Sequence, residues 1–169
     1  LLHIASQLGT YGIKRPELKL RKAFLGAEPY SEETRRKIED LLEIEVYNSY
    51  GLSEMNGPGV AFECVYKNGM HLWEDSFLME VIDPVTKEAY DDDSEGELVF
   101  TTLTRTATPL LRYRTRDLSR VYSDICPCGR THKRIARIKG RSDDMLIING
   151  VNVFPSQIEE VLMKNPQVG

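Results

Sequence analysis

This sequence lacks long hydrophobic runs, an even set of cysteines and a dominant sign of charge, and each absence excludes a class of protein. No apolar run approaches the roughly 18 residues that cross a bilayer. The first twenty residues carry neither a basic leader nor a small-residue cleavage site, so we expect no signal peptide there. Three cysteines fit a disulfide framework poorly, which favours a reducing cytoplasm. The 22 basic and 26 acidic residues give a net charge of −4, which disfavours a nucleic-acid or membrane surface.

The composition that remains is that of a soluble globular protein. With 41% apolar and 28% charged residues, the chain has enough apolar side chains for a real core. A length of 169 residues can hold one ordinary domain or parts of two. Leu1 begins within a helical pattern of apolar residues and no capping residue precedes it. We therefore expect the chain to be cut from a longer one.

The first third of the sequence predicts a strand–helix–strand unit. The segment LKLRKAFL (18–25) is typical of a strand, and Ser31 is placed to cap a helix that runs to about Glu43. The segment IEVYNSYG (44–51) is typical of a second strand, which is expected to pass into an exposed loop rich in Tyr, Asn, Ser and Gly before the lone carboxylate of Glu54. The short links between these elements imply a parallel pair of strands.

From Val60 onward the pattern predicts an antiparallel β block. Hairpins are expected to turn at Asn68-Gly69 and at Asp83-Pro84. Three further strands are expected at 96–103, 110–118 and 119–125, with 91–95 as a solvated loop. The fold class expected is therefore mixed α/β and β.

The end of the sequence predicts one more hairpin and a helix. The hairpin is expected to turn at Asn149-Gly150. Pro155 is suited to open the helix, with Ser156 and Glu159 at the spacing of a capping box.

Four separated motifs carry the functional signal. They are GAEP (26–29), YNSYGLSE (47–54), GELVFTTL with YRTRD (ending at Asp117), and GRSDDMLIINGVNVFPSQIEE (140–160). In this order they resemble the adenylate-forming acyl- and aryl-CoA ligases, and most closely the phenylacetate–CoA ligase family within them. The resemblance covers nearly the whole chain. It implies that residues 1–141 are the C-terminal part of a large adenylate-binding domain, and that 142–169 are the hinge and the beginning of a small α+β C-terminal domain.

The resemblance implies a reaction with two steps. The family joins a carboxylate to the α-phosphate of ATP, releases pyrophosphate, and then lets the coenzyme A thiol displace AMP. The expected activity is ATP-dependent ligation of an aryl acid, phenylacetate, to coenzyme A through an acyl-adenylate. Mg²⁺ is expected as well, because it prefers one or two carboxylates together with phosphate oxygens. The expected partners are the acid and coenzyme A, with no nucleic acid and no membrane, and a homodimer is left open.

The same resemblance implies roles for individual residues. Glu54 would be the Mg²⁺ ligand, Ser53 would orient the α-phosphate, and Asp117 would accept both ribose hydroxyls. Asp143 would be the hinge residue, and Gly150 would lie on a hairpin brought up to the pantetheine tunnel. The nucleotide-binding residues implied are Ala27, Glu28, Pro29, Asn48, Ser49, Tyr50, Gly51, Leu52, Ser53, Asp117 and Arg141.

Two parts of the family pattern are missing from these residues. The phosphate loop rich in Gly, Ser and Thr would precede the strand–helix–strand unit, and the adenylation lysine would lie near the true C-terminus. By themselves, moreover, Asn, Ser and Gly are what turns are made of. Asp117 alone would also fit a ladder of cross-strand ion pairs.

The three cysteines and two histidines suggest a metal clip that is independent of the family chemistry. Cys126 and Cys128 are two residues apart, and Cys64 and His71 flank the turn at Asn68-Gly69. Three thiolates and one imidazole are a standard structural Zn²⁺ set. His132 is the alternative fourth ligand. The other interpretation is a buried small Cys64 beside a Cys-Pro-Cys-Gly turn.

Two alternatives to the main functional hypothesis follow. The acid could be another aromatic or a short aliphatic one. The chain could also be a zinc-stapled module that binds a nucleotide or a partner and catalyses nothing.

Overall fold

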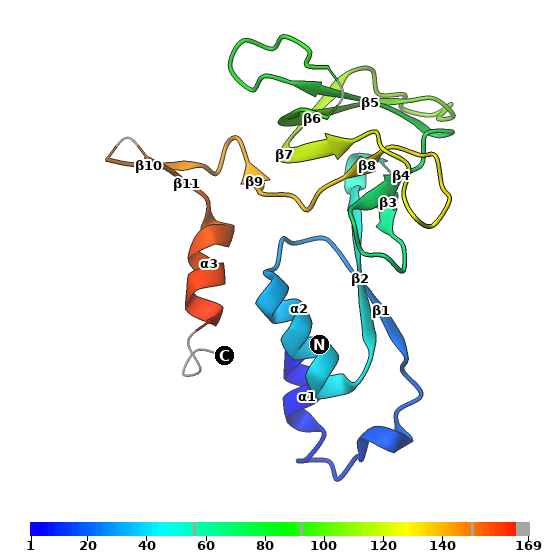
Figure 1. Cartoon of the computed structure of the whole chain (residues 1–169), viewed down its shortest axis with the longest axis vertical. Coiled ribbons are helices and arrows are strands. Elements are labelled where there is room, and N and C mark those ends of the chain that lie inside the picture. The colour runs from blue at the N-terminus through cyan, green and yellow to red at the C-terminus, as the bar shows by residue number, and fades with distance from the viewer. Residues whose placement is uncertain (56, 92, 150, 165–169) are drawn as a thin grey trace.

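The computed structural model describes residues 1–55, 57–91, 93–149 and 151–164. A large mixed sheet dominates it, with strand order β1-β2-β3-β4-β8-β7-β6-β5 and with β9 beside β7. Figure 1 shows β5, β6 and β7 at one end of the molecule and α1 and α2 at the other, with β2 running between them. The helices are α1 (Leu2–Gln7), α2 (Glu32–Leu42) and α3 (Pro155–Met163), with 3₁₀ turns η1 (Arg15–Glu17) and η2 (Ser53–Met55). The strands are β1 (Lys22–Leu25), β2 (Glu45–Leu52), β3 (Gly57–Glu63), β4 (Met70–Leu72), β5 (Phe77–Ile82), β6 (Glu95–Thr102), β7 (Tyr113–Tyr122), β8 (Arg134–Ile135), β9 (Gly140–Arg141), β10 (Leu146–Ile148) and β11 (Val151–Val153).

The predicted strand–helix–strand unit is confirmed. β1 and β2 pair in parallel, with α2 between them in the chain. The helix begins where the sequence predicts, because the Ser31 hydroxyl accepts a hydrogen bond from the Thr34 backbone N–H at 3.1 Å. It ends at Leu42, because the next residue, Glu43, takes the left-handed conformation with a φ of 53°. Ile38 and Leu42 of α2 pack with Val46 of β2 in a small core of their own.

The second strand predicted at 44–51 is confirmed as β2, but its Tyr, Asn, Ser and Gly residues do not form the exposed loop that was expected before Glu54. β2 continues to Leu52, and Asn48 and Tyr50 are buried within it. The residue types favour a turn, but the second half of this strand pairs antiparallel with β3, from Ser49 opposite Phe62 to Leu52. Pairing with a neighbouring strand therefore overrides the local turn preference.

The antiparallel block is confirmed, with two corrections. The segments expected as separate strands at 110–118 and 119–125 form one strand, β7, because β6 pairs along most of its length. The turn at Asn68-Gly69 is wider than a two-residue hairpin, since β3 ends at Glu63 and β4 begins at Met70. The main core lies between these strands and includes Leu98, Phe100 and Ile135, all fully buried.

The last hairpin and helix form a separate group beside α2 (Figure 1). β10 and β11 pair antiparallel with Ile148 opposite Val151, as predicted, while Gly150 lies outside the described residues. The predicted capping box of Ser156 and Glu159 is wrong. Phe154 occupies the N-cap position, and its backbone N–H donates to Gln157 Oε1 at 2.8 Å. Among the described residues, no helix is both long and apolar enough to span a bilayer.

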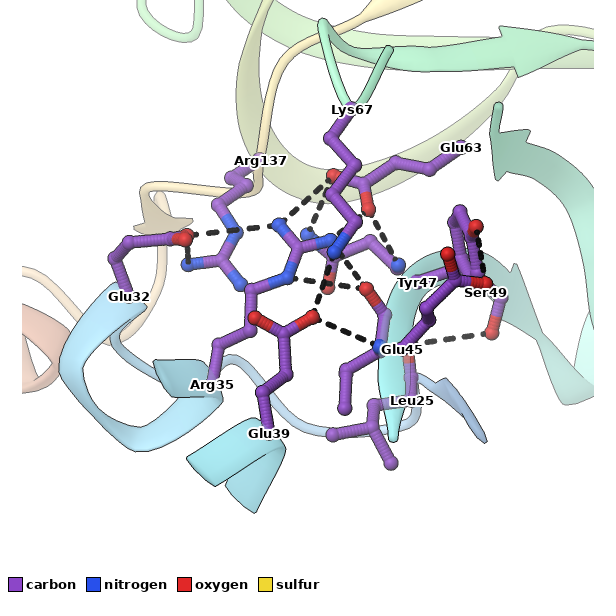
Figure 2. A network of polar contacts seen from close by, with 12 residues as sticks. Leu25, Glu32, Arg35, Glu39, Glu45, Tyr47, Ser49, Glu63, Lys67 and Arg137 are labelled. Atoms are coloured by element: carbon purple, nitrogen blue, oxygen red, sulfur yellow. Dashed lines mark hydrogen bonds and ion pairs between the residues drawn. The ribbon is translucent and has the colours of Figure 1, made fainter. Parts of the chain in front are cut away.

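One edge of β2 is closed by charged side chains instead of a strand. Pairing with β3 begins only at Ser49, so the backbone of Val46 and Asn48 needs other partners on that side. The Val46 N–H donates to Glu39 Oε1 at 2.9 Å, and the Val46 carbonyl accepts from Arg35 Nη2 at 2.8 Å. The Asn48 N–H donates to Glu63 Oε2 at 2.7 Å. Figure 2 shows how these side chains converge on the strand.

The ion pair between Arg35 and Glu63 completes this closure. Both side chains are almost fully buried, at 4% and 3% exposure, and they contact each other directly. Each also satisfies a backbone group of β2, so neither charge is left without hydrogen bonds. The pair therefore joins α2, β2 and the end of β3.

Arg35→Met should destabilise the protein strongly, because it leaves the Glu63 carboxylate buried without its charged partner. Breaking a buried pair in this way costs about 3–5 kcal/mol. Arg36→Met is the matched control, since Arg36 is the exposed neighbour on the same helix. Thermal and denaturant unfolding of the intact protein measure both. If both variants lost the same small amount of unfolding free energy, the buried ion pair would not be a major source of stability.

Candidate nucleotide pocket and cysteine–histidine cluster

A pocket of about 190 Å³ lies where the end of β1, the second half of β2 and the end of β9 meet. Five parts of the chain that are far apart in the sequence contribute to its wall. The predicted nucleotide-binding residues that line it are Ala27, Glu28, Pro29, Asn48, Ser49, Tyr50, Gly51, Leu52, Asp117 and Arg141. Ser53 is the one predicted nucleotide-binding residue that does not.

The turn after β1 approaches β2 very closely. A side chain at Gly26 would meet the Ser49 backbone oxygen and hydroxyl at 2.6 Å. Ala27 follows in the left-handed region, with a φ of 74°. Glycine is therefore required at the first position of the turn, and this close approach places Glu28 and Pro29 against the pocket.

Asp117 is the most deeply placed acid of the pocket. It comes from β7, is 7% exposed, and accepts a hydrogen bond from the Tyr50 hydroxyl on its Oδ2 at 2.7 Å. Its other oxygen lies 3.7 Å from Arg141 Nη1. The Tyr50 ring packs against Phe100, with centroids 6.1 Å apart. The tyrosine thus links the core of the β block to the carboxylate of the pocket.

Burial governs the electrostatics of this pair. Desolvation raises the pKa of Asp117 above its ordinary value, although the hydrogen bond from Tyr50 and the charge of Arg141 oppose it. Desolvation, followed by the nearby charge of Asp117, also raises the pKa of Tyr50 well above 10. Tyr50 is therefore the hydrogen-bond donor of this pair, and burial makes the charged form of Asp117 costly to the folded protein.

Ser53 and Glu54 follow the pocket directly but do not line it. Both are exposed in the single turn of η2, immediately after Leu52. The backbone carbonyl of Glu54 accepts a hydrogen bond from Arg105, and its exposed side chain is hydrogen-bonded to Tyr113, whose pKa is raised mainly by burial and also by this contact.

Arg141 and Asp143 form a bidentate pair just after β9. Arg141 Nε and Nη2 each lie 2.9 Å from an oxygen of Asp143. Arg141 Nη1 also donates to the Thr115 carbonyl at 3.3 Å. The same arginine therefore contacts β7 and the segment that leads to the last hairpin.

Residues that the sequence analysis did not identify complete the pocket. They are Leu25, Tyr30, Met70, Arg137 and Ile138. Tyr30 directly follows the GAEP motif, and its ring lies under the Arg137 guanidinium at 4.6 Å. The proximity of Tyr30 to the motif was a usable signal. Arg137 and Ile138 gave none, because the loop that carries them has no motif of its own.

A second group of reactive side chains lies away from the pocket. The ligand atoms of Cys64, His71, Cys126 and Cys128 all lie within 4.8 Å of one another. The two thiols Cys64 and Cys126 are 3.7 Å apart, and Cys128 Sγ is 3.4 Å from His71 Nε2. His132 is not part of this group. Its ring instead packs edge-on to Trp73, with centroids 6.2 Å apart.

The protonation of this group suits a metal site. Burial lowers the pKa of His71, which favours the neutral imidazole that binds metals. Hydrogen bonds from Arg130, the backbone N–H first, lower the pKa of Cys128 to about 7, although burial raises the pKa of Cys64. All three cysteines are free thiols in the structure.

Comparison with known proteins now adds independent evidence. No protein-family model matches the chain. A phenylacetate-coenzyme A ligase from Thermus thermophilus is 51% identical over 166 residues, which are 98% of this chain and 37% of that protein. One from Pseudomonas putida is 52% identical over 169 residues, 99% of this chain and 38% of that protein.

The chain matches a segment of the phenylacetate-coenzyme A ligase family. This confirms the resemblance inferred from the motifs, and the chain spans a little over a third of the length of these relatives.

A solved structure agrees with the fold. A 2-hydroxyisobutyryl-CoA ligase in its postadenylation state is 30% identical and superposes with a TM-score of 0.88, over 97% of this chain and 35% of that one. The expected fold class, a segment of the adenylate-forming enzyme fold, is thereby confirmed. The same ligase in its thioesterification state gives a TM-score of 0.77 over 98% of this chain. The segment of that ligase that corresponds to this chain therefore differs in shape between the two states.

Asp117→Asn should stabilise the folded protein at pH 7, because it removes a charge that burial disfavours. Because the pKa of Asp117 is higher in the folded protein than in the unfolded chain, where it is near 3.8, protonated Asp117 is compatible with the fold below about pH 4. Stability is then lost as the pH rises through the folded pKa and the buried side chain becomes charged. The gain in melting temperature should therefore be largest at neutral pH and shrink toward about pH 4. Asp40→Asn, on the exposed face of α2, is the control. A lower melting temperature for Asp117→Asn at pH 7 would show that Tyr50 and Arg141 outweigh burial.

Proposed function

We propose that this chain supplies the adenylate-binding part of an ATP-dependent acid–CoA ligase that acts through an acyl-adenylate. The observation that carries the proposal is the convergence of five separated parts of the chain on one pocket, which ten of the residues implied by the family motifs line. The acid proposed is phenylacetate, because relatives about 50% identical over the whole chain are named phenylacetate-coenzyme A ligases. Coenzyme A is the second substrate.

Within this proposal the pocket holds the nucleoside. Asp117 is a carboxylate with two oxygens at the base of the pocket, which suits the two hydroxyls of a ribose. Asn48 and Tyr50, both on β2, line the pocket together with Asp117 of β7. The turn of Glu28 and Pro29 lines it as well and would form a wall for a flat base. The cost of burying Asp117 supports this assignment, since strained electrostatics cluster at functional sites.

The exposed residues after β2 suit the phosphate end. The Ser53 hydroxyl would orient the α-phosphate, and the Glu54 carboxylate would hold Mg²⁺ together with phosphate oxygens. Bound Mg²⁺ supplies charge stabilisation for the anionic oxygens crowded around phosphorus. The exposure of Glu54 and its position immediately after the pocket fit a hard cation that keeps several waters. The family's phosphate loop and adenylation lysine would have to come from other parts of a longer protein.

The proposal includes a hinge after β9. Residues 1–141 would belong to the large domain and 142–169 to the small one, with Asp143 at the pivot and Gly150 on the moving hairpin. The bidentate contact of Arg141 with Asp143 supports this boundary, because it ties the last residue of β9 to the first residues beyond it. The unequal superposition on two states of a 30% identical ligase supports movement within this segment.

Glu54→Gln should abolish adenylation and leave the fold intact. The change removes one charge from the proposed Mg²⁺ shell at nearly constant volume, and charge stabilisation through a metal is worth several kcal/mol. Phenylacetate-dependent exchange of pyrophosphate into ATP, measured on the intact protein, tests it. Glu88→Gln, at an exposed acid in the turn after β5, should keep normal exchange. Near-normal exchange in folded Glu54→Gln would remove Glu54 from the mechanism.

We propose in addition that Cys64, His71, Cys126 and Cys128 hold one structural Zn²⁺. In a tetrahedral site, sulfur at about 2.3 Å and nitrogen at about 2.0–2.1 Å from the metal would lie about 3.8 Å (S–S) and about 3.6 Å (S–N) from one another. The observed separations of 3.7 Å and 3.4 Å are close to these values. Four protein ligands would close the site, so the ion would be structural and would not take part in catalysis.

The surrounding packing holds the two cysteine-bearing loops together. Arg134 is 1% exposed and donates to the Asn68 carbonyl in one loop and to Asp124 Oδ1, at 2.8 Å, in the other. These contacts involve no metal ligand, so they would hold the two loops together with or without a bound ion. A reducing cytoplasm, where free thiols persist, is the location that fits this site.

Protein purified without chelator should contain about one zinc per chain. His71→Asn should lose the zinc and lower the melting temperature, because one of four ligands is removed. His132→Asn is the matched control, and it should keep the metal. Elemental analysis of the three proteins gives the result. Absence of zinc from the wild-type protein would contradict the site. Loss of zinc in His132→Asn but not in His71→Asn would show that His132 is the fourth ligand.

A further inference from the structure

The side chain of Asn48 lies between the buried ion pair and the pocket. Val46, Asn48 and Tyr50 alternate along β2 and therefore share one face of the strand. Val46 packs against α2 on this face, and Tyr50 reaches Asp117 in the pocket. Asn48 is 6% exposed and lines the pocket, so its amide stands between these two environments.

The chemistry of Glu63 fixes which end of that amide faces the pocket. Asn48 Nδ2 donates to Glu63 Oε1 at 3.1 Å, and the Asn48 backbone N–H donates to Glu63 Oε2 at 2.7 Å. A carboxylate paired with a guanidinium only accepts hydrogen bonds. The amide must therefore turn its NH₂ group toward Glu63, whatever the pocket contains. The carbonyl oxygen is the end that remains for a ligand.

Arg35 prevents this arrangement from relaxing. It contacts the Glu63 carboxylate from α2, and its Nε and Nη2 bind the Val46 carbonyl at 3.2 Å and 2.8 Å. Glu63 is thus held on both sides, by the guanidinium and by the Asn48 backbone. Figure 2 shows Arg35 and Glu63 meeting beside β2.

We propose that Glu63, held by Arg35, is a positioning residue that sets the base specificity of the nucleotide pocket through Asn48. The inference rests on the proposed nucleotide function. With one hydrogen of its NH₂ group donated to Glu63, Asn48 turns its carbonyl oxygen toward the pocket as an acceptor, which pairs with the exocyclic amine of a 6-aminopurine. A 6-oxopurine would place a carbonyl against that carbonyl and leave both acceptors unpaired.

Glu63→Gln is the decisive variant. With its oxygen in the place of Glu63 Oε2, glutamine would keep the contacts to Arg35 Nη2 and the Asn48 N–H and would lose only the 3.4 Å contact to Arg35 Nη1, so its NH₂ group would face the Asn48 amide. That amide would then turn over and offer its own NH₂ group to the pocket. The ratio of kcat/KM for ATP to that for inosine triphosphate, in acid-dependent adenylation by the intact protein, should fall by about tenfold to a hundredfold. If Glu63 had a purely structural role, the variant would lower kcat/KM for ATP and for inosine triphosphate by the same factor, and their ratio would not change.

Glu39→Gln is the matched control. It makes the same carboxylate-to-amide change at the same edge of β2, but Glu39 contacts the Val46 N–H and Lys67, not the Asn48 amide. Its nucleotide ratio should equal that of the wild type. An unchanged ratio in folded Glu63→Gln would overturn the proposal, as would a shift of the same size in Glu39→Gln.

Two further measurements keep the test decisive if Glu63→Gln does not fold. The wild-type protein itself must prefer ATP to inosine triphosphate, and Asn48→Ala must bring the ratio close to one. A wild type without preference, or a retained preference in Asn48→Ala, overturns the role of Asn48 and with it that of Glu63. If the wild-type protein adenylates with neither nucleotide, the proposed function fails first, and this inference falls with it.

Discussion

The buried ion pair of Arg35 and Glu63 is the interaction on which the arrangement of this chain depends. β2 must serve two neighbours, β1 in parallel along its first half and β3 antiparallel along its second. Between Val46 and Asn48 it leaves backbone groups without a strand partner on the β3 side. Both residues are buried, so water does not supply these hydrogen bonds. Charged side chains take the place of the missing strand and allow a parallel unit and an antiparallel block to share one strand.

This solution places the pocket at the point where β2 changes neighbours. The parallel pairing ends at Leu25 opposite Asn48, and the turn after β1 is then free to fold over the strand. Ligands in sheets with parallel strands bind beyond the carboxyl ends of those strands, where the connections diverge. The pocket occupies such a place, and β7 and β9 bring Asp117 and Arg141 to it from the antiparallel side. The burial that stabilises the junction is also what makes Asp117 costly to ionise.

How much the sequence could predict depended on how far apart along the chain the interacting residues lie. α2 and the parallel pair are encoded locally, by Ser31 and by short connections, and both were predicted. The grouping of Cys64 with Cys126 and Cys128 was also predictable, because thiols are few and their chemistry restricts their partners. The strand at 44–51 was predicted as well, but the burial of Asn48 and Tyr50 within it was not, since Asn, Ser and Gly favour an exposed turn when considered alone. Arg35 and Glu63 are 28 residues apart and Tyr50 and Asp117 are 67 apart, and no local pattern indicates that either pair meets.

The segment from β8 to β9 connects the two chemically distinct sites. Arg134 pairs with His71 across β4 and β8, beside the cysteine cluster, and Ile135 is fully buried in the main core. Arg137 and Ile138 then line the pocket, and Arg141 ends β9 opposite Asp117. This stretch has only two residues in each of its strands, so its path is fixed mainly by what holds its ends. The cluster and Arg134 hold one end and Asp117 holds the other, so the proposed zinc would have a structural purpose outside the proposed nucleotide pocket. It would fix the start of the segment whose later residues form one wall of the pocket.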